Sequence, residues 1–599
     1  MAIVFAVVCG TLILAPQIIF ILNEGDHYKG YYMMKTEAEW FYLARMNEFH
    51  DEGRIGNPFL LEHKYYGPQF MQSGAETILA IPGKLLDISV PTLNLMYKFL
   101  LPALTFLLLY ALIFRLTASS PWSIAGGLMF LVGSTWLYAN NLSHFLRGDS
   151  SFFTEFVYNR PVHPQFDGVL FFLYLNVLLT IFERSSSRDI QGPRNTRPDT
   201  GVQGGSPRSN LKNNSPRFDL GLPGLTLYSC GLVSYVWYIV LAALLGLSFY
   251  TYFYSFTFFL ALNFVVFLLW LYFGKKKEAL SLAFATIGGV LIGIPQLLAI
   301  YAAYHHPDYP FLAAVQPVDY GHAPEISKNG LLVSLLFVIY LFRTQALRAI
   351  GFVRERAIFF LGLLVTTFVV VNQQVLTGIS LHSGHYHHNF NIPIFIIVLM
   401  FLASVVASRV LRSENTRSDV DVQGGSTRSN LKNNSPRFDL VLPGLTLYFP
   451  DFVFRALPWI LSAVFIATGA TIQYFSYQYH APETSREQRY MPALSWLKEN
   501  TPNGSVVMAN ETLSRIIPIF TGNNVMSGNP GAAYLVPLER RLFTPENLLL
   551  SNDFLHDIKQ YRVDYILWDQ KADPNWSISH FNFISLYSDD GLVIYQLSQ

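Results

Sequence analysis

The stretch AIVFAVVCGTLILAPQIIFIL, residues 2–22, is followed at once by Asn23-Glu24-Gly25-Asp26, and together they decide the fold. As a helix, the first part is long enough to cross a hydrocarbon core of about 30 Å. The second part places two carboxylates where that helix meets water, and a polar loop continues to residue 96. An acid at this place is open to water yet held by a rigid helix, which suits a base acting at the membrane surface.

Further apolar stretches recur along the 599-residue chain, of which 51% is hydrophobic and 14% charged. These stretches predict an all-α polytopic membrane protein with about eleven transmembrane helices. The predicted spans are 2–22, 97–116, 122–140, 167–183, 231–250, 254–274, 279–303, 330–344, 357–378, 392–411 and 456–474.

The composition excludes several classes of protein. A net charge of +1 gives no field that would attract nucleic acid, so no nucleic-acid partner is expected. Cys9 and Cys230 lie within predicted spans or beside them and indicate neither a disulfide framework nor a zinc site. No Lys or Arg precedes the first span and no small-x-small cleavage pattern follows it, which favours a retained anchor helix over a signal peptide.

Basic residues predict the orientation in a cell (inner) membrane, because they are enriched in cytoplasmic loops. The basic loops alternate along the chain and are predicted to be cytoplasmic, as is the N-terminus. They contain Arg115, Arg184 to Lys212, Lys275 to Lys277, Arg343 to Arg356 and Arg409 to Arg437. The loops predicted outside are 23–96, 141–166, 304–329 and 379–391, with everything after residue 475.

The chain divides into a transmembrane core, residues 1–480, and a predicted extracytoplasmic α/β domain, residues 484–599. Alternation at Ser505–Asn510, Val563–Trp568 and Phe583–Tyr587 predicts short strands. Helices are expected near 491–500, 512–519 and 552–561. This domain shows no catalytic motif, so a scaffold or substrate-guiding role is expected.

Two predicted cytoplasmic loops, 184–230 and 412–455, carry near copies of one segment. Residues 195–228 and 415–448 are identical at 29 of 34 positions, whereas the flanking spans do not match. The pattern indicates a mobile element inserted twice, and its Gly, Ser, Asn, Pro and Arg content favours disorder. Surface loops accept such insertions at little entropic cost. A partner-binding role is the alternative.

The first outer loop supplies the candidate catalytic acids: Asp26 first, then Glu24, Glu37 and Glu39. Thr36-Glu37-Ala38-Glu39 fits a capping box, so Glu39 also has a structural explanation. The helix that it opens is expected to end near Gly53 and to lie along the membrane interface with its aromatic face in the headgroups. The acids would otherwise simply mark the water boundary.

Cationic candidates lie in two further outer loops. Arg160 and His163 stand directly before a span, where they would either hold a phosphate or snorkel to lipid headgroups. His382, His385 and His387 form a histidine-rich tract, which suggests contact with a phosphate or sugar, or a metal site. No cysteine or nearby carboxylate completes a tetrahedral set of zinc ligands. A divalent metal is therefore left as an alternative, and no cofactor is predicted.

Together these features resemble the GT-C class of polytopic glycosyltransferases, which includes protein O-mannosyltransferases, aminoarabinose transferases and oligosaccharyltransferase catalytic subunits. The resemblance rests on Glu24-Gly25-Asp26, the long first outer loop and the many spans. Three further stretches look like those of bacterial members with an outer C-terminal domain: Glu39–Arg45, Arg160–Gln165, and Asn372–Gly378 followed by His385-Tyr386. The usual Asp-Glu or Asp-Asp pair is missing, since Gly25 separates the acids and Ala stands at position 38.

The resemblance implies a hexosyl or pentosyl transferase that uses a polyprenyl-phosphate sugar from the lipid bilayer. Its acceptor would be a glycan, a lipid or a protein. Asp26 would deprotonate the acceptor hydroxyl in a single inverting displacement. Arg160, His163 and one or more of the three histidines at 382, 385 and 387 would stabilise the departing phosphate.

Two other functions compete with this interpretation. A transporter or flippase would also explain the spans and the outer charges, but the hydropathy shows no inverted repeat and the long first loop has no transport purpose. A non-catalytic anchor for the C-terminal domain would not need so many spans.

Overall fold

A computed structural model gives the structure of the protein. It describes residues 1–34, 37–64, 71–137, 159–190, 232–307, 318–349, 351–422, 451–527, 554–576 and 583–597, with residues 141, 147, 549 and 578. The duplicated segment falls outside these ranges, apart from residues 415–422, which continue a helix.

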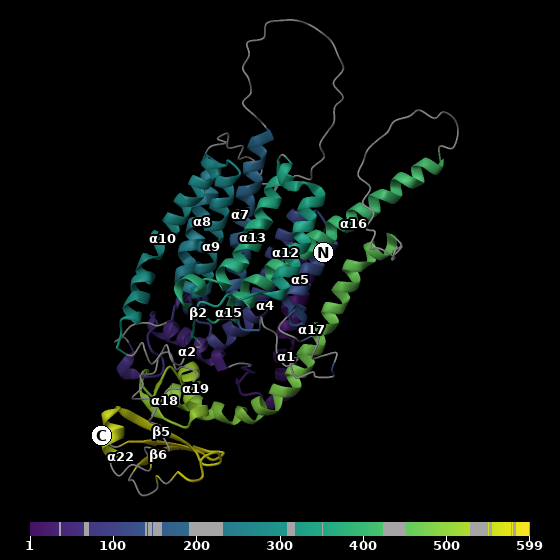
Figure 1. Ribbon diagram of the computed structural model, residues 1–599. Helices are drawn as coiled ribbons and strands as arrows, with labels where there is room; N and C mark the ends of the chain where they lie inside the picture. Colours follow the sequence, from purple (N-terminus) through teal and green to yellow (C-terminus); the bar gives the residue numbers. More distant parts are fainter. Residues whose placement is uncertain are drawn as a thin grey trace, which may run out of the picture.

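A bundle of long apolar helices forms the membrane part, which makes the chain a multi-pass membrane protein (Figure 1). Among the described residues, eight helices are long and apolar enough to cross a membrane. Three predicted spans form helices that fall short of this length or, as for α8, contribute only a 17-residue apolar stretch, Tyr235–Thr251, among the described residues. The long helices include α1 (Ala2–Glu24), α4 (Val90–Thr117), α7 (Asp167–Ile190), α9 (Phe253–Tyr272), α10 (Lys276–Tyr304), α13 (Phe352–Val371), α16 (Ile392–Val422) and α17 (Asp451–Glu487). The shorter ones are α5 (Ser120–Leu131), α8 (Leu232–Thr251) and α12 (Lys328–Thr344).

The bundle is arranged around α7, whereas α10 lies at its edge. In the apolar window of α7 and its preceding turn 72% of the residues are buried, against 17% in α10. Small residues let α10 approach α8 closely: a Cβ at Gly289 would come within 2.7 Å of Leu245, and one at Gly293 within 2.4 Å of Phe249. Close backbone approach of this kind is how helices associate where water supplies no driving force.

The loop after α1, predicted to be the first outer loop, forms a layer of short helices below the bundle (Figure 1). It holds α2 (Glu37–Glu52) and α3 (Gly74–Leu86), and two buried ion pairs hold α2 in place. Arg45 contacts Glu76 of α3 at 2.6 Å, and Glu39 contacts Lys98 of α4 at 2.6 Å. Removal of one partner from such a pair leaves a buried charge uncompensated, so α2 has little freedom to shift.

The predicted helix of the first outer loop is confirmed, but its predicted setting is wrong. Phe41, Tyr42 and Leu43 are buried within a core shared with the C-terminal domain, so they do not lie among lipid headgroups. The physical reason is that α19 (Glu511–Thr521) of that domain covers α2, a contact between segments some 470 residues apart that local periodicity does not encode.

The C-terminal domain is a five-stranded sheet with helices, as predicted. Its strands run in the order β4-β3-β5-β7-β6; β3 pairs in parallel with β4 and β5, while β7 pairs antiparallel with β5 and β6. The strands are β3 (Val506–Met508), β4 (Asn524–Val525), β5 (Val563–Asp569), β6 (Ile584–Asp589) and β7 (Leu592–Gln596). The helices are α18 (Met491–Asn500), α19 (Glu511–Thr521) and α22 (Phe554–Gln560).

This domain packs against the loop between α1 and α4. The backbone N–H of Val525 in β4 donates to the carbonyl of Phe59 at 2.7 Å, so the loop covers the β4 edge of the sheet. The side chain of Asn524 donates to the carbonyl of Pro58 at 3.2 Å. One apolar core therefore runs from the first outer loop into the domain.

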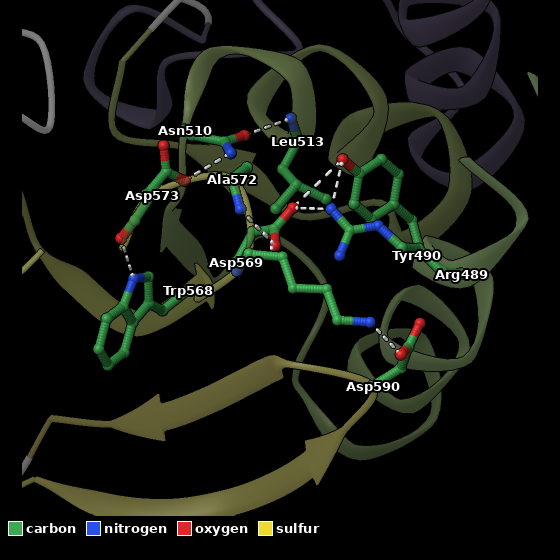
Figure 2. Close-up of polar contacts among 10 residues, drawn as sticks. Arg489, Tyr490, Asn510, Leu513, Trp568, Asp569, Ala572, Asp573 and Asp590 are labelled. Atoms are coloured by element: carbon green, nitrogen blue, oxygen red, sulfur yellow. Dashed lines mark hydrogen bonds and ion pairs between the residues drawn. The ribbon is translucent and has the colours of Figure 1, made fainter. Parts of the chain in front are cut away.

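A buried carboxylate fixes the domain to the end of α17 (Figure 2). Asp569, the last residue of β5, is fully buried and accepts from the Arg489 guanidinium and the Tyr490 hydroxyl. It also accepts from the backbone N–H groups of Lys571 and Ala572, each at 3.1 Å. Four donors satisfy this carboxylate, which makes it the joint between membrane helix and sheet.

Candidate functional site

Residues 159–166, the end of the predicted second outer loop, lead into the bundle through a short π-helical turn, η5 (Pro161–Phe166), directly before α7. Pro161 and Pro164 lie on either side of His163, whose backbone is extended at φ −138°, ψ 127°. Proline cannot donate a backbone hydrogen bond, so regular helix begins only at Asp167. This local break buries His163 at the N-terminal end of α7, with Arg160 just before it.

His163 is held on three sides. Its Nδ1 is 2.6 Å from Oδ2 of Asp167, one helical turn further along. Its ring stacks on Tyr252 with centroids 4.5 Å apart and meets Tyr42 edge to face at 5.1 Å. A buried carboxylate and two aromatic rings thus fix the orientation of the imidazole.

The predicted histidine tract reaches the same place. The Tyr252 hydroxyl and Nδ1 of His385 are hydrogen-bonded at 2.5 Å. The His385 ring stacks on Tyr254 with centroids 4.6 Å apart, and His382 meets it edge to face at 5.0 Å. Contacts therefore run without a gap from Arg160 and His163 to His382 and His385. We call this set the cation–aromatic cluster; it consists of Tyr42, Arg160, His163, Asp167, Tyr252, Tyr254, His382 and His385.

Arg160 supplies the permanent charge of the cluster. Its guanidinium lies over the Tyr42 ring at 5.9 Å, and no described residue forms a hydrogen bond or ion pair with it. It acts electrostatically on Tyr42, Asp167, Tyr252 and His385, so its charge is felt across the cluster. Burial raises the pKa of Tyr42 to about 12, although the charge of Arg160 opposes that rise, so the phenol stays neutral at physiological pH.

Asp167 has an acceptor to spare. Its Oδ2 is used by His163, whereas its buried Oδ1 has no hydrogen-bond partner among the residues that the structure describes. Buried polar atoms without a partner are uncommon and call for an explanation, such as a role in the chemistry of a site. Among the described residues, the cluster therefore combines a cation without a hydrogen-bond or ion-pair partner with a carboxylate of which one oxygen has no hydrogen-bond partner.

His387 lies one turn beyond the cluster and has a different partner. Its Nε2 is 2.8 Å from a carboxylate oxygen of Glu325. Two short strands bring these loops together, since β1 (Val318–Tyr320) pairs antiparallel with β2 (Ile379–Leu381). Asn372 reinforces the contact by bonding both to the N–H and to the carbonyl of Glu325. Of the predicted phosphate-binding residues, His387 is thus paired with an acid outside the cluster, whereas His163 is paired with Asp167 inside it.

The predicted catalytic acids lie in three different settings. Asp26 is exposed and Glu24 half-buried at the end of α1, and no described interaction links either of them to the cluster. Glu39 is buried, pairs with Lys98 and accepts from Asn94 at 2.8 Å. Glu37 is the first residue of α2. Thr36, the predicted N-cap, falls outside the described residues.

No group of three or more His, Cys, Asp or Glu side chains is arranged to hold a metal ion within the described ranges. Tyr252 instead separates His163 from His385, and His382 meets His385 ring to ring. This arrangement offers stacking surfaces and hydrogen-bond donors to a ligand.

Sequence reasoning missed four members of the cluster: Tyr42, Asp167, Tyr252 and Tyr254. One signal was available for Asp167, because it stands four residues after His163 and would share its helical face. The run Tyr250-Thr-Tyr-Phe-Tyr254 between two apolar helices also stands out. Aromatic residues between spans usually anchor a helix at the interface, so the run alone did not indicate a site.

No family model matches the chain, and no curated protein matches it. Solved structures do. Archaeal oligosaccharyltransferase AglB from Archaeoglobus fulgidus, in complex with an inhibitory peptide and a dolichol-phosphate, is similar at 12% identity and a TM-score of 0.48, over 100% of this chain and 74% of that one. ArnT from Cupriavidus metallidurans in the apo state gives 13% and 0.43, over 96% and 97%. ArnT bound to undecaprenyl phosphate gives 13% and 0.41, over 98% and 97%. Both enzymes are GT-C glycosyltransferases, the class that the sequence resembles.

Proposed function

We propose that the protein is a membrane glycosyltransferase that moves a sugar from a polyprenyl-phosphate donor to an acceptor hydroxyl at the outer face of the membrane. The observation that carries this proposal is the cation–aromatic cluster. It gathers four of the five residues that the sequence predicted for phosphate binding: Arg160, His163, His382 and His385.

The cluster suits a departing phosphate for electrostatic reasons. Arg160 is permanently charged, and no described carboxylate forms an ion pair with it. A guanidinium can bind a phosphate through two parallel hydrogen bonds. The histidines add ring N–H donors whose positions are set beforehand by Asp167 and Tyr252. Donors placed in advance stabilise charge that develops as the glycosidic bond breaks.

The reaction would be a single inverting displacement. The acceptor oxygen forms a bond to the anomeric carbon, the bond from that carbon to the phosphate oxygen breaks, and the electron pair leaves with the polyprenyl phosphate. The acceptor proton passes to a base, for which Asp26 stays the predicted residue. Asp26 is exposed on the side of the bundle that carries the C-terminal domain, since neighbouring Asn23 bonds to Tyr477 near the end of α17. Asp167 is assigned to the positioning of His163.

Binding of undecaprenyl phosphate to the purified protein tests the phosphate site. Arg160→Gln is expected to weaken binding roughly 10- to 100-fold, since a hydrogen bond to a charged group contributes about 1.5–3 kcal/mol. Arg54→Gln, which neutralises an exposed arginine of the first outer loop, is the control and should bind as wild type. Equal binding by wild type and Arg160→Gln would exclude the cluster as the donor site.

Turnover tests the reaction itself. Labelled polyprenyl-phosphate sugars are supplied in nanodiscs with candidate acceptors, and release of polyprenyl phosphate is measured beside movement of the label across vesicle membranes. Asp26→Asn should reduce turnover about 10²- to 10⁴-fold while donor binding is kept. Movement of label across the membrane without release of polyprenyl phosphate would identify a flippase.

A further inference from the structure

A second polar site lies at the opposite end of the bundle. A cavity of about 230 Å³ opens between the end of α4, the start of α13 and the middle of α16. It is lined by Leu116, Thr117, Arg356, Phe401, Ser404, Val405, Ser408 and Arg409. A site of this size holds much more than one water molecule, which needs only about 10–15 Å³.

The cavity and the cation–aromatic cluster are separated by the thickness of a membrane. Arg409 follows His387 by 22 positions, mostly in helix, which at 1.5 Å per residue corresponds to about 33 Å. Likewise, α4 begins beside the first outer loop and ends at Thr117 on the cavity. The two sites therefore lie at the two faces of the bilayer, and the basic loops predict that the cavity faces the cytoplasm.

Two arginines, Arg356 and Arg409, line the cavity, and the Glu183 carboxylate acts electrostatically on Arg356 as well as pairing with Arg115. Arg115, in the last turn of α4, is balanced by Glu183 at 2.7 Å. No described carboxylate forms an ion pair with Arg356, and its buried Nε lacks a hydrogen-bond partner among the described residues. Its Nη2 donates to the carbonyl of Arg115 at 2.7 Å, which fixes the guanidinium at the cavity wall. Arg409 lines the same cavity and is exposed.

The remaining lining is amphiphilic. Leu116, Phe401 and Val405 form an apolar side, while the serine hydroxyls form a polar one. Ser404 and Ser408 donate to the carbonyls of Phe401 and Ser404, so their protons are engaged and their lone pairs stay free to accept. Two arginines, hydroxyl acceptors and an apolar wall match a headgroup that carries both a phosphate and a hydroxyl donor, with an acyl chain below it.

We propose that this cavity binds the phosphate of an anionic phospholipid with a hydroxyl-bearing headgroup, at the membrane face opposite the cation–aromatic cluster. Arginines near a membrane also snorkel to headgroups without any specific site. What distinguishes Arg356 is that a hydrogen bond to the end of α4 holds it inside a recess, whereas Arg348 on the same side is exposed.

The test counts lipids that stay bound to the full-length protein after delipidation, by native mass spectrometry. Nanodiscs of phosphatidylcholine, with or without phosphatidylglycerol, supply the lipids. Wild type should retain one phosphatidylglycerol and no comparable phosphatidylcholine. Arg356→Gln and Arg409→Gln should each lower retention roughly five- to tenfold, whereas Arg348→Gln should match wild type. Because Arg356 also bonds to α4, the exposed Arg409 keeps the test informative if Arg356→Gln folds poorly.

A second arm separates a lipid from a soluble ligand. Protein in phosphatidylcholine alone is given inorganic phosphate or glycerol 3-phosphate, and hydrogen exchange of residues 401–409 is measured. Slower exchange with these ions, lost in Arg409→Gln, would confirm the phosphate site with a soluble occupant. Equal retention of both lipids without any protection by phosphate would overturn the proposal, as would a loss in Arg348→Gln equal to that in Arg409→Gln.

Discussion

Two buried aspartates, one in the bundle and one in the C-terminal domain, lie beside cationic side chains and yet differ in kind. Asp569 accepts from four donors, and both of its oxygens are used (Figure 2). Asp167 accepts from His163 through one oxygen, and its other oxygen has no partner among the described residues. A carboxylate with both oxygens hydrogen-bonded serves the fold, whereas one with an oxygen to spare, beside an arginine that no described residue pairs with, suits a ligand site.

The largest expected effect is on the joint. Asp569→Ala removes the acceptor of Arg489 and Tyr490 and should destabilise the C-terminal domain by about 3–5 kcal/mol, the usual effect of breaking a buried pair. Hydrogen exchange of residues 563–569 in the full-length protein measures it, and the protection of β5 should fall. Turnover per folded molecule should persist. If protection in β5 is unchanged, the satisfied carboxylate is not what holds the domain.

The next effect is expected in the cluster. Asp167→Asn keeps the size of the side chain and removes its charge, so the loss should fall on the orientation of His163. We expect turnover to drop roughly 10- to 100-fold, equivalent to about 1.5–3 kcal/mol, with a changed pH profile. The matched variant Asp569→Asn should change stability more than turnover. If both variants lose stability equally and keep activity, the distinction between the two aspartates fails.

The predicted histidines offer a comparison within one loop. His385 belongs to the cluster, whereas His387 is paired with Glu325. His385→Ala should weaken binding of polyprenyl phosphate about tenfold, as expected for one lost hydrogen bond to a charged group. His387→Ala should leave binding within about twofold. The reverse order would move the phosphate site toward Glu325.

The sequence predicted the helical membrane core and the α/β domain, because apolar length and alternation are local signals. Four of the five predicted phosphate-binding residues lie together in the cluster, which follows from their places in predicted outer loops beside spans; that they bind phosphate stays a prediction. Tyr42 could not be predicted in the same way, because it meets His163 from α2, which ion pairs between distant segments, Arg45–Glu76 and Glu39–Lys98, hold in place. Tyr252 stands at the start of α9 and meets His163 only through the packing of separate helices. The burial of α2 under α19 could not be predicted for the same reason. Eight helices among the described residues are long enough to span a membrane, against about eleven predicted spans, partly because helices such as α5 end early.

A third buried carboxylate, that of Glu48 in α2, is intermediate between the fully hydrogen-bonded Asp569 and the partly hydrogen-bonded Asp167. It accepts from the N–H of Gly56 at 2.8 Å, and burial raises its pKa to about 7. The folded state therefore favours the protonated carboxyl of Glu48. The resulting contribution to the free energy of unfolding is complete below the unfolded pKa, about 4.3, and is lost as pH rises through about 7. Glu48→Gln should remove this fall of stability with pH, which amounts to about 1–2 kcal/mol after allowance for screening. Melting temperatures between pH 4.5 and 8 measure it, with the exposed Glu499→Gln as control; parallel curves for wild type and Glu48→Gln would exclude this role.

The smallest effect belongs to the second ion pair of Figure 2, between Lys571 and Asp590. Both side chains are about half exposed, so water and salt screen their attraction. The hydrogen bond from Lys571 lowers the pKa of Asp590, so what stability the pair adds is present above the unfolded pKa and is lost as pH falls. Asp590→Asn should change the stability of the domain by less than about 1 kcal/mol, and salt should erase the difference. Because the pair adjoins Asp569 in space, a large effect of Asp590→Asn on exchange in β5 would mean that the joint depends on the sum of nearby charge and not on the buried carboxylate.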